Sequence, residues 1–303
     1  MKRTNLLCIG LCLCITLSVY ADTFGTGDNQ FEIDFVTISG DTNPTSGYGI
    51  VNNDYRMGIY EITNSQWISF VNSTARTVTG SPSYAYRYDS HWTGTNLPTS
   101  NVSWLEAAQF VNWLNTSTGH QAAYNFTGTQ GTEDYTFSVW DVTEAWDGTN
   151  LYRHKDAYYF LPTEDEWAKA AYWNGTTFQT YATTGDNVPV AGIDSNFESV
   201  IGQPWDVGSG SEELNGTYDM MGNLLEWMEN PRVSGDYLPN SYRSDRGGYY
   251  DHLAPGISSS FRRYAYPDLE NYGISFRVAS VPEPATLVLL GLGGLTLRRR
   301  KKA

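Results

Sequence analysis

The densest group of residues that could do chemistry lies between Ser244 and Arg263, in the stretch SDRGGYYDHLAPGISSSFRR. It holds three arginines, two adjacent glycines, two adjacent tyrosines and one histidine. This composition is typical of the wall of a binding or catalytic site. The stretch contains no cysteine and no other obvious nucleophile, so its role depends on the rest of the chain.

Thiol chemistry is confined to the N-terminal segment. Residues 1–21 carry Lys2 and Arg3, then an apolar run, then Ala21, which is the order of a secretory signal peptide. The three cysteines, Cys8, Cys12 and Cys14, all lie in this segment. The exported chain would therefore have no disulfide, no thiolate metal site and no cysteine nucleophile. A lipoprotein anchor is the alternative, but leucines precede Cys12 and Cys14 where a small residue is expected.

Oxygen donors form a second group of candidates, in the block DMMGNLLEW. A tight turn at Gly222 and Asn223 exposes carbonyl groups, and Glu226 follows four residues after the glycine. A donor set made only of oxygens is what a hard cation such as calcium prefers. The alternative is that Glu226 pairs with an arginine in the core, because a buried carboxylate needs some cation.

Other catalytic patterns are weak. Paired acids occur at Asp165 and Glu166 and at Glu212 and Glu213, where capping or solvated roles are expected. No G-x-S-x-G, H-E-x-x-H or Gly-rich phosphate loop is present. The four histidines, His91, His120, His154 and His252, are scattered singly along the chain.

Three helix starts can be placed from capping boxes, in which a hydroxyl precedes a Glu or Gln by three residues. Strand-like runs such as FEIDFVTI and GISFRVAS are short, and Gly, Asn, Ser and Asp recur between them. The pattern predicts one α+β domain with few helices and much ordered loop. The predicted boxes are Thr63-Asn64-Ser65-Gln66, Ser103-Trp104-Leu105-Glu106 and Thr163-Glu164-Asp165-Glu166.

Composition limits the partners. From Asp22 to Val281 about 12 basic and 32 acidic residues remain, a net charge of about −20. Such a chain repels nucleic acid and suits divalent cations or neutral sugars. Aromatic residues make up 15% of the sequence. They either fill an irregular core or form half-exposed surfaces on which sugars stack.

The C-terminal region has three parts in order. Pro282-Glu283-Pro284 is followed by a short apolar stretch and by five basic residues, 298–302. This arrangement resembles the PEP-CTERM sorting signal. The resemblance implies a transient membrane hold, removal by an exosortase near Pro282, and release to the cell surface or an exopolysaccharide matrix. We therefore divide the chain into a signal peptide at 1–21, one domain at 22–280 and a sorting signal at 281–303.

Six blocks between Tyr60 and Ser280 resemble the sulfatase-modifying-factor, or formylglycine-generating-enzyme, domain. They are YEITNSQWISFVN, LPTSNVSWLEAAQFVNWLN, FLPTEDEWAKAAYW, NGTYDMMGNLLEWMEN, DRGGYYD and YGISFRVAS, and they follow one another in the family's order. The resemblance implies an elaborated C-type-lectin-like α+β fold. It agrees with the pattern of short strands and few helices.

The resemblance also implies roles for particular residues. Catalytic members bind copper through two cysteines that would fall at His252 and Ile257, or at Asp251 and Gly256 if the alignment slips by one. Copper(I) prefers thiolates, so copper binding is not expected here. A related oxygenase branch uses three histidines on an added helical domain, which the scattered histidines do not match. Family members bind calcium at positions matching Met221, Gly222, Leu224 and Glu226, and a second site would fall near Asn196 and Phe197 with Asp206 as a candidate ligand.

Two classes of function follow. The first is an exported, non-enzymatic, calcium-stabilised protein that binds a polysaccharide or protein at the cell surface. The second is an oxidoreductase or protein-modifying enzyme like the family's catalytic members. The missing cysteine pair favours binding, because removal of obligatory metal ligands removes the reaction.

Overall fold

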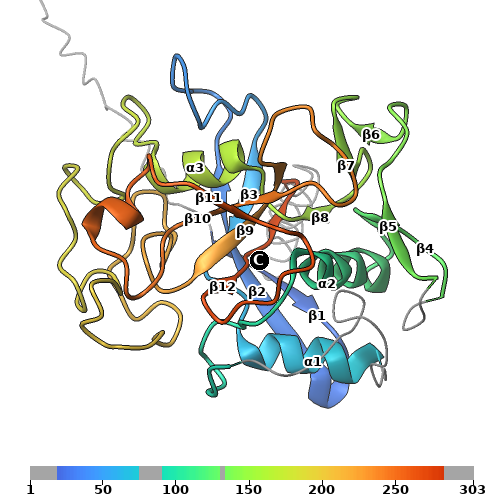
Figure 1. Cartoon of the computed structure of the whole chain (residues 1–303), viewed down its shortest axis with the longest axis horizontal. Coiled ribbons are helices and arrows are strands. Elements are labelled where there is room, and N and C mark those ends of the chain that lie inside the picture. Colours follow the sequence, from blue (N-terminus) through green and yellow to red (C-terminus); the bar gives the residue numbers. More distant parts are fainter. Residues whose placement is uncertain (1–18, 75–90, 130–133, 283–303) are drawn as a thin grey trace, which may run out of the picture.

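The structure, a computed structural model, describes residues 19–74, 91–129 and 134–282. These ranges contain three α-helices and a set of short strands joined by long ordered loops (Figure 1). The helices are α1 (Asn64–Thr74), α2 (Trp104–Ser117) and α3 (Glu164–Tyr172). Two short 3-10 turns, η1 (Gly27–Asn29) and η3 (Ala254–Ile257), complete the helical structure described.

Each α-helix begins with the capping box that the sequence predicts. The hydroxyl of the first residue accepts from the backbone N–H three residues on, and the longer side chain accepts from the backbone N–H of the first residue. The sequence prediction of these three starts is confirmed. The pairs are Thr63 with Gln66, Ser103 with Glu106, and Thr163 with Glu166.

One sheet joins both ends of the described chain. Its five strands follow the order β1-β2-β3-β13-β8, and every neighbouring pair is antiparallel. The predicted strand FEIDFVTI forms β2 and buries most of its side chains. The strands are β1 (Val19–Phe24), β2 (Phe31–Ile38), β3 (Tyr55–Gly58), β8 (Tyr159–Phe160) and β13 (Ala279–Ser280).

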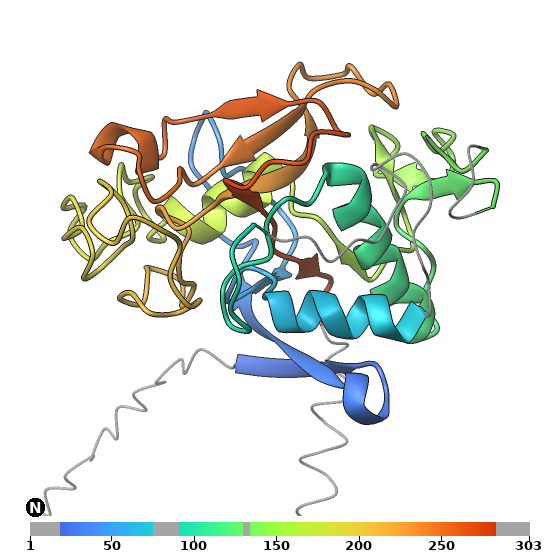
Figure 2. The same cartoon turned by 60° about the horizontal axis from the view of Figure 1, so that its bottom comes forward.

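A second sheet has the order β11-β10-β9-β12, with β12 parallel to β9. Figure 2 shows its strands at one end of the molecule and β1 and β2 at the other, with the helices between them. The run GISFRVAS supplies β12 and β13, so the chain crosses from one sheet to the other within it. The strands are β9 (Leu225–Pro231), β10 (Arg243–Arg246), β11 (Arg263–Ala265) and β12 (Ile274–Ser275).

Two hairpins extend from the body near α2. The first pairs β4 (Asn125–Thr127) with β5 (Thr136–Ser138). The second pairs β6 (Ala145–Trp146) with β7 (Asn150–His154).

Aromatic rings fill much of the core. Trp67 and Phe70 of α1 pack against Phe110 of α2 with ring centroids 5.8 and 5.1 Å apart, and the fully buried Trp167 belongs to a second cluster around α3. Much of the aromatic content is therefore explained by the core. Half-exposed rings such as Tyr264 and Tyr266 remain at the surface.

Candidate functional site

Two of the three arginines of the stretch 244–263 form ion pairs with the start of α3, while Arg263 lies 3.8 Å from Asp245. Glu164 accepts from Arg246 Nε at 2.9 Å and from Arg262 Nη2 at 2.6 Å, and Ser244 Oγ donates to it at 3.0 Å. Glu164 and Arg246 are both buried. These ion pairs place one carboxylate between two guanidinium groups and hold β10 against α3.

The glycine pair lets the following loop fold closely over β10. Gly248 has φ +78°, and a Cβ there would overlap the carbonyl of Gly256. Only glycine meets both requirements without strain. The close approach places η3 directly above the pair, which brings His252 and Ile257 to the same loop.

His252 and Ile257 occupy different environments. The His252 ring is half-buried between Tyr249 and Phe261, with ring centroids 4.5 and 5.0 Å away, and burial lowers its pKa. Ile257 is fully buried in the core, and its carbonyl accepts from the Tyr172 hydroxyl at 3.0 Å. An aliphatic side chain has no donor atom, so this pair of residues does not fit copper. No group of three or more His, Cys, Asp or Glu residues in the described chain could hold a metal ion.

Glu226 has an arginine partner. Its carboxylate accepts from Arg277 Nε at 2.6 Å and from Arg277 Nη2 at 2.7 Å, and the indole N–H of Trp167 donates to it at 2.9 Å. Glu226 and Arg277 are completely buried. The sequence left two partners open for Glu226, a calcium ion or an arginine in the core. In the structure its partner is the arginine. Arg277 also donates to the carbonyls of Gly58, Ile59 and Tyr218.

The two predicted sets of calcium ligands meet at one contact between loops. Gly222, at φ +88°, approaches Asn196 so closely that a Cβ would overlap the Asn196 carbonyl. The next residue, Asn223, donates its backbone N–H to that carbonyl at 2.9 Å. The Met221 carbonyl accepts from Ser195 Oγ. Met221, Leu224 and Phe197 are buried beside this contact.

One side-chain oxygen at this contact lacks a partner. Asn196 is fully buried, and its Nδ2 donates to the Gln203 carbonyl at 2.9 Å, which fixes the orientation of the amide. Its Oδ1 accepts no hydrogen bond in the described structure. A buried amide oxygen without a donor is unfavourable unless a cation or water fills the gap. Among the predicted ligands, Asn196 is the residue whose environment fits a cation.

Two buried acids lie beside the same contact, Glu213 and Glu61, and the sequence analysis did not single out Glu61. Asn223 donates to Glu61 Oε2 at 2.6 Å, while Glu61 Oε1 has no partner in the described structure. Burial, with the nearby charges of Asp219 and Glu226, raises the pKa of Glu61 well above its usual range. Burial also raises the pKa of Glu213 to about 8, although that residue was expected in a solvated or capping role. Only the position of Glu61 within the block YEITNSQW could have drawn notice to it.

The other predicted acids are structural. Glu166 caps α3 and accepts from Arg153 at 2.8 Å. Asp165 accepts from the Gly49 backbone N–H at 2.9 Å. The capping role of Glu166 agrees with the expectation from the sequence, whereas Asp165 is partly buried and tethers the loop at Gly49.

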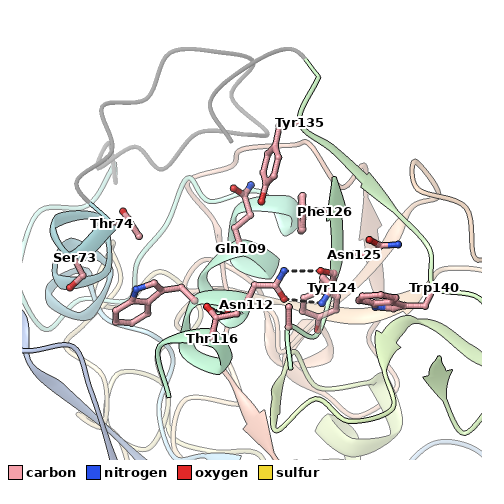
Figure 3. Close-up of a pocket in the computed structure, with 12 residues that line it drawn as sticks. Ser73, Thr74, Gln109, Asn112, Thr116, Tyr124, Asn125, Phe126, Tyr135 and Trp140 are labelled. Atoms are coloured by element: carbon pink, nitrogen blue, oxygen red, sulfur yellow. Dashed lines mark hydrogen bonds between the residues drawn. The ribbon is translucent and has the colours of Figure 1, made fainter. Parts of the chain in front are cut away.

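A cavity of about 420 Å³ lies apart from all of these residues, between the end of α1, one face of α2 and the hairpin β4–β5 (Figure 3). Amide, hydroxyl and aromatic side chains line it, and Figure 3 shows the side chains of Gln109 and Tyr135 pointing toward one another. Its position and lining were not predicted from the sequence.

Comparison with known families decides the identity of the domain. The profile of the sulfatase-modifying factor enzyme 1-like domain matches residues 18–281. The chain belongs to this family. Its α+β fold with few helices is the formylglycine-generating-enzyme type that the sequence predicted. The PEP-CTERM protein-sorting motif matches residues 280–302, so the family domain is followed directly by a sorting signal.

Curated relatives of this sulfatase-modifying factor domain carry different names. A hercynine oxygenase of Mycolicibacterium thermoresistibile is 24% identical over 233 residues, which are 70% of this chain and 48% of the relative. The chaperone protein LppX of Paenibacillus barcinonensis is 25% identical over 248 residues, 74% of this chain and 80% of the relative. The chain thus spans about half the length of the oxygenase.

Solved structures support the fold alone. Treponema denticola variable protein 1 superposes with a TM-score of 0.61 at 21% identity, over 86% of this chain and 99% of that one. CarF gives a TM-score of 0.58 at 22% identity, over 83% and 99% of the two chains.

The sorting motif begins where the family domain ends. Pro282 is the last described residue, and Glu283 and Pro284 lie outside the described residues. Val281 is held by its backbone N–H, which donates to the Tyr158 carbonyl at 2.9 Å. No helix in the described part of the chain is long and apolar enough to cross a bilayer. The motif implies export and processing by an exosortase-type enzyme.

Proposed function

We propose that this sulfatase-modifying factor domain is a non-enzymatic, calcium-stabilised binding protein of the cell surface or exopolysaccharide matrix. The observation that carries the proposal is the pair of residues at the copper-binding positions of catalytic members. His252 supplies at most one imidazole, packed between two rings, and Ile257 supplies no donor. After Cys14 the chain has no cysteine that could replace them.

The alternative is an oxidoreductase or protein-modifying enzyme. The hercynine oxygenases among its relatives favour this alternative, but they match over only about half of their length. Another relative is named a chaperone protein, so the family domain also occurs in proteins that are not named as oxygenases. The residues at positions 252 and 257 argue against copper chemistry in this chain.

Half-exposed aromatic rings support a binding role. Tyr242 packs against Tyr264 and Tyr266, with ring centroids 5.2 and 4.1 Å away, and the Arg232 guanidinium lies 3.6 Å from the Tyr264 ring centroid. Tyr264 and Tyr266 are 42% and 54% exposed. Exposed rings of this kind suit partners that combine apolar faces with polar edges, such as polysaccharides and proteins.

We propose that calcium binds at the contact between Asn196 and Gly222. The partnerless Oδ1 of Asn196 and the backbone carbonyl of Phe197 would hold the ion, with Asp206 as a candidate carboxylate. Calcium accepts neutral carbonyl and amide oxygens together with carboxylates. Bound there, it would fix the loop around Asn196 against the turn at Gly222. The alternative ligand set of Met221, Gly222, Leu224 and Glu226 stays a prediction. Because Glu226 already pairs with Arg277, we favour the ligands around Asn196.

The sorting signal gives the proposed location. We infer that the protein is held at the membrane through its C-terminal segment until an exosortase releases it near Pro282. The released domain then binds a polysaccharide or protein at the surface, and the acidic chain excludes nucleic acid as a partner. The proposal as a whole is tested by assaying the domain for copper-dependent turnover of a Cys-x-Pro-x-Arg peptide, which it predicts to be absent.

A further inference from the structure

One face of α2 is built for contact with a polar ligand. Gln109, Asn112, Trp113 and Thr116 follow the spacing i, i+3, i+4, i+7, so they share one side of the helix. All four line the cavity of about 420 Å³, while the opposite side of α2 packs into the core. The volume lies within the usual range for ligand pockets.

The wall facing α2 is aromatic. Phe126 of β4 stacks on Tyr135, with centroids 5.2 Å apart and planes 20° apart, and both rings are half-buried. Trp140 donates its indole N–H to the Ala123 carbonyl at 2.9 Å, which fixes its ring at the rim of the cavity. Figure 3 shows Phe126 and Trp140 on the side away from Ser73 and Thr74.

Asn112 holds the two walls together. Its Nδ2 donates to the Tyr124 carbonyl at 2.7 Å, and its Oδ1 accepts from the Tyr124 N–H at 2.8 Å (Figure 3). The amide therefore pairs with the backbone leading into β4 as a neighbouring strand would. These two hydrogen bonds hold α2 against the backbone that leads into the hairpin.

The lining selects against charged ligands. Among the described residues, the 12 that line the cavity include no Asp, Glu, Lys, Arg or His, although the chain is strongly acidic. An anion or cation would enter without a charged partner, which is unfavourable. Asn112 keeps a second N–H beyond its bond to the Tyr124 carbonyl, and Thr116 Oγ1, which donates to the Asn112 carbonyl, can still accept. A purely apolar ligand would cover these two groups without bonding to them, which is unfavourable. A ligand with apolar faces and uncharged hydroxyl edges satisfies both walls.

We propose that this cavity binds a sugar unit of a neutral polysaccharide. The C–H faces of the sugar ring contact Phe126, Tyr135 and Trp140, and its hydroxyls exchange hydrogen bonds with Asn112 and Thr116 of α2. The inference rests on the proposed binding function and gives it a site and a ligand class.

The test uses two neighbouring lysine variants of α2 in the mature protein. Thr116 is exposed and lines the cavity, so Thr116→Lys fills the cavity and adds a charge. Lysine has a higher helix propensity than threonine, so this variant is expected to fold. Ser117→Lys adds the same charge one residue further along, at a position that does not line this cavity, and is the matched control. Thermal melting of both variants checks that they are folded.

Binding is measured by affinity electrophoresis in gels containing dextran, mannan or alginate. The inference predicts that a neutral polymer retards the wild type and Ser117→Lys equally, that Thr116→Lys loses at least tenfold in affinity, and that alginate has no effect. Retardation by neither neutral polymer, retardation by alginate alone, or equal behaviour of the two lysine variants would overturn it.

The same experiment separates this inference from the proposed function. If the protein binds alginate and Thr116→Lys does not alter that binding, the proposed binding function is supported but the cavity beside α2 is not the binding site. Copper-dependent turnover of the Cys-x-Pro-x-Arg peptide would contradict the proposed non-enzymatic function, independently of the result of the electrophoresis.

Discussion

The carboxylate of Glu226 and the guanidinium of Arg277 form a bidentate ion pair at 2.6 and 2.7 Å in the centre of the domain. The pair joins β9 to the segment between β12 and β13, and through the carbonyls of Gly58 and Ile59 it reaches the end of β3. It thus links the two sheets. Neither side chain is exposed to solvent.

Replacing Glu226 by Gln tests whether this carboxylate serves the arginine or an ion. The variant leaves the Arg277 charge buried without its counter-charge, which typically costs roughly 3–5 kcal/mol. We expect the same loss of stability in chelator and in calcium, measured by denaturant unfolding. If Glu226→Gln keeps wild-type stability in chelator but loses a calcium-dependent gain, the carboxylate is a calcium ligand instead.

Calcium should act through Asn196. An ion that binds only the folded state adds roughly 2.7 kcal/mol at a hundredfold excess over its Kd, so chelation should lower the Tm of the wild type. Magnesium should restore it poorly because it demands near-ideal octahedral geometry. Asn196→Asp adds a negative ligand and should enlarge the calcium-dependent shift in Tm, while lowering the Tm in chelator because the donor to the Gln203 carbonyl is lost. A wild type whose Tm ignores both chelator and calcium would rule out this site.

Processing should remove segments at both ends of the chain and leave both new termini beside the side chain of Arg56. Its guanidinium pairs with Asp22 at 2.6 Å and its Nε donates to the Val281 carbonyl at 3.3 Å. Cleavage after Ala21 would fall inside β1 and leave Asp22 as the first residue, still bound to Arg56. Mass spectrometry of the native extracellular protein is therefore expected to find a start near Asp22 and an end near Val281. Extracellular protein that still ends at Ala303 would contradict processing by an exosortase.

Stability should fall as the pH rises from 5 to 8. Asp245 is fully buried without a hydrogen-bond partner in the described structure, and burial raises its pKa from 3.8 to about 7. Arg263 at 3.8 Å and Arg262 oppose this rise, and Glu164 adds to it. Because the folded state holds the proton more tightly, this stability is fully present below about pH 4 and is lost as the pH passes 7.

Asp245→Asn is the matched control for this pH dependence. The amide keeps the shape of the side chain but does not titrate, so the slope of the free energy of unfolding between pH 5 and 8 should become smaller. The full shift corresponds to roughly 4 kcal/mol. An identical slope in the variant would show that Asp245 is not responsible.

Local chemistry made the helices predictable. Each capping box needs only two residues three positions apart, as in Ser103 and Glu106, so the sequence alone places the start of the helix. The strand FEIDFVTI was predicted for the same reason, because its alternation is contained within eight residues. The order of the six blocks then gave the family and its fold.

Long-range pairing limited the prediction of the site. Glu226 could be a calcium ligand or an ion-pair partner, and only the fold brings Arg277, 51 residues away, to its side. Asn223 and Glu61 are 162 residues apart in the chain. The polar stripe of α2 can be read from the spacing of Gln109, Asn112 and Thr116, but the hairpin that faces it cannot.

The central claim is that this domain binds without catalysing, and turnover tests it most directly. The purified domain, residues 22–281, would be given copper, oxygen and a peptide containing Cys-x-Pro-x-Arg, with a catalytic family member and a boiled sample as controls. The account predicts no formylglycine above the boiled sample, because His252 and Ile257 cannot replace two thiolates. Formylglycine above that level would contradict it.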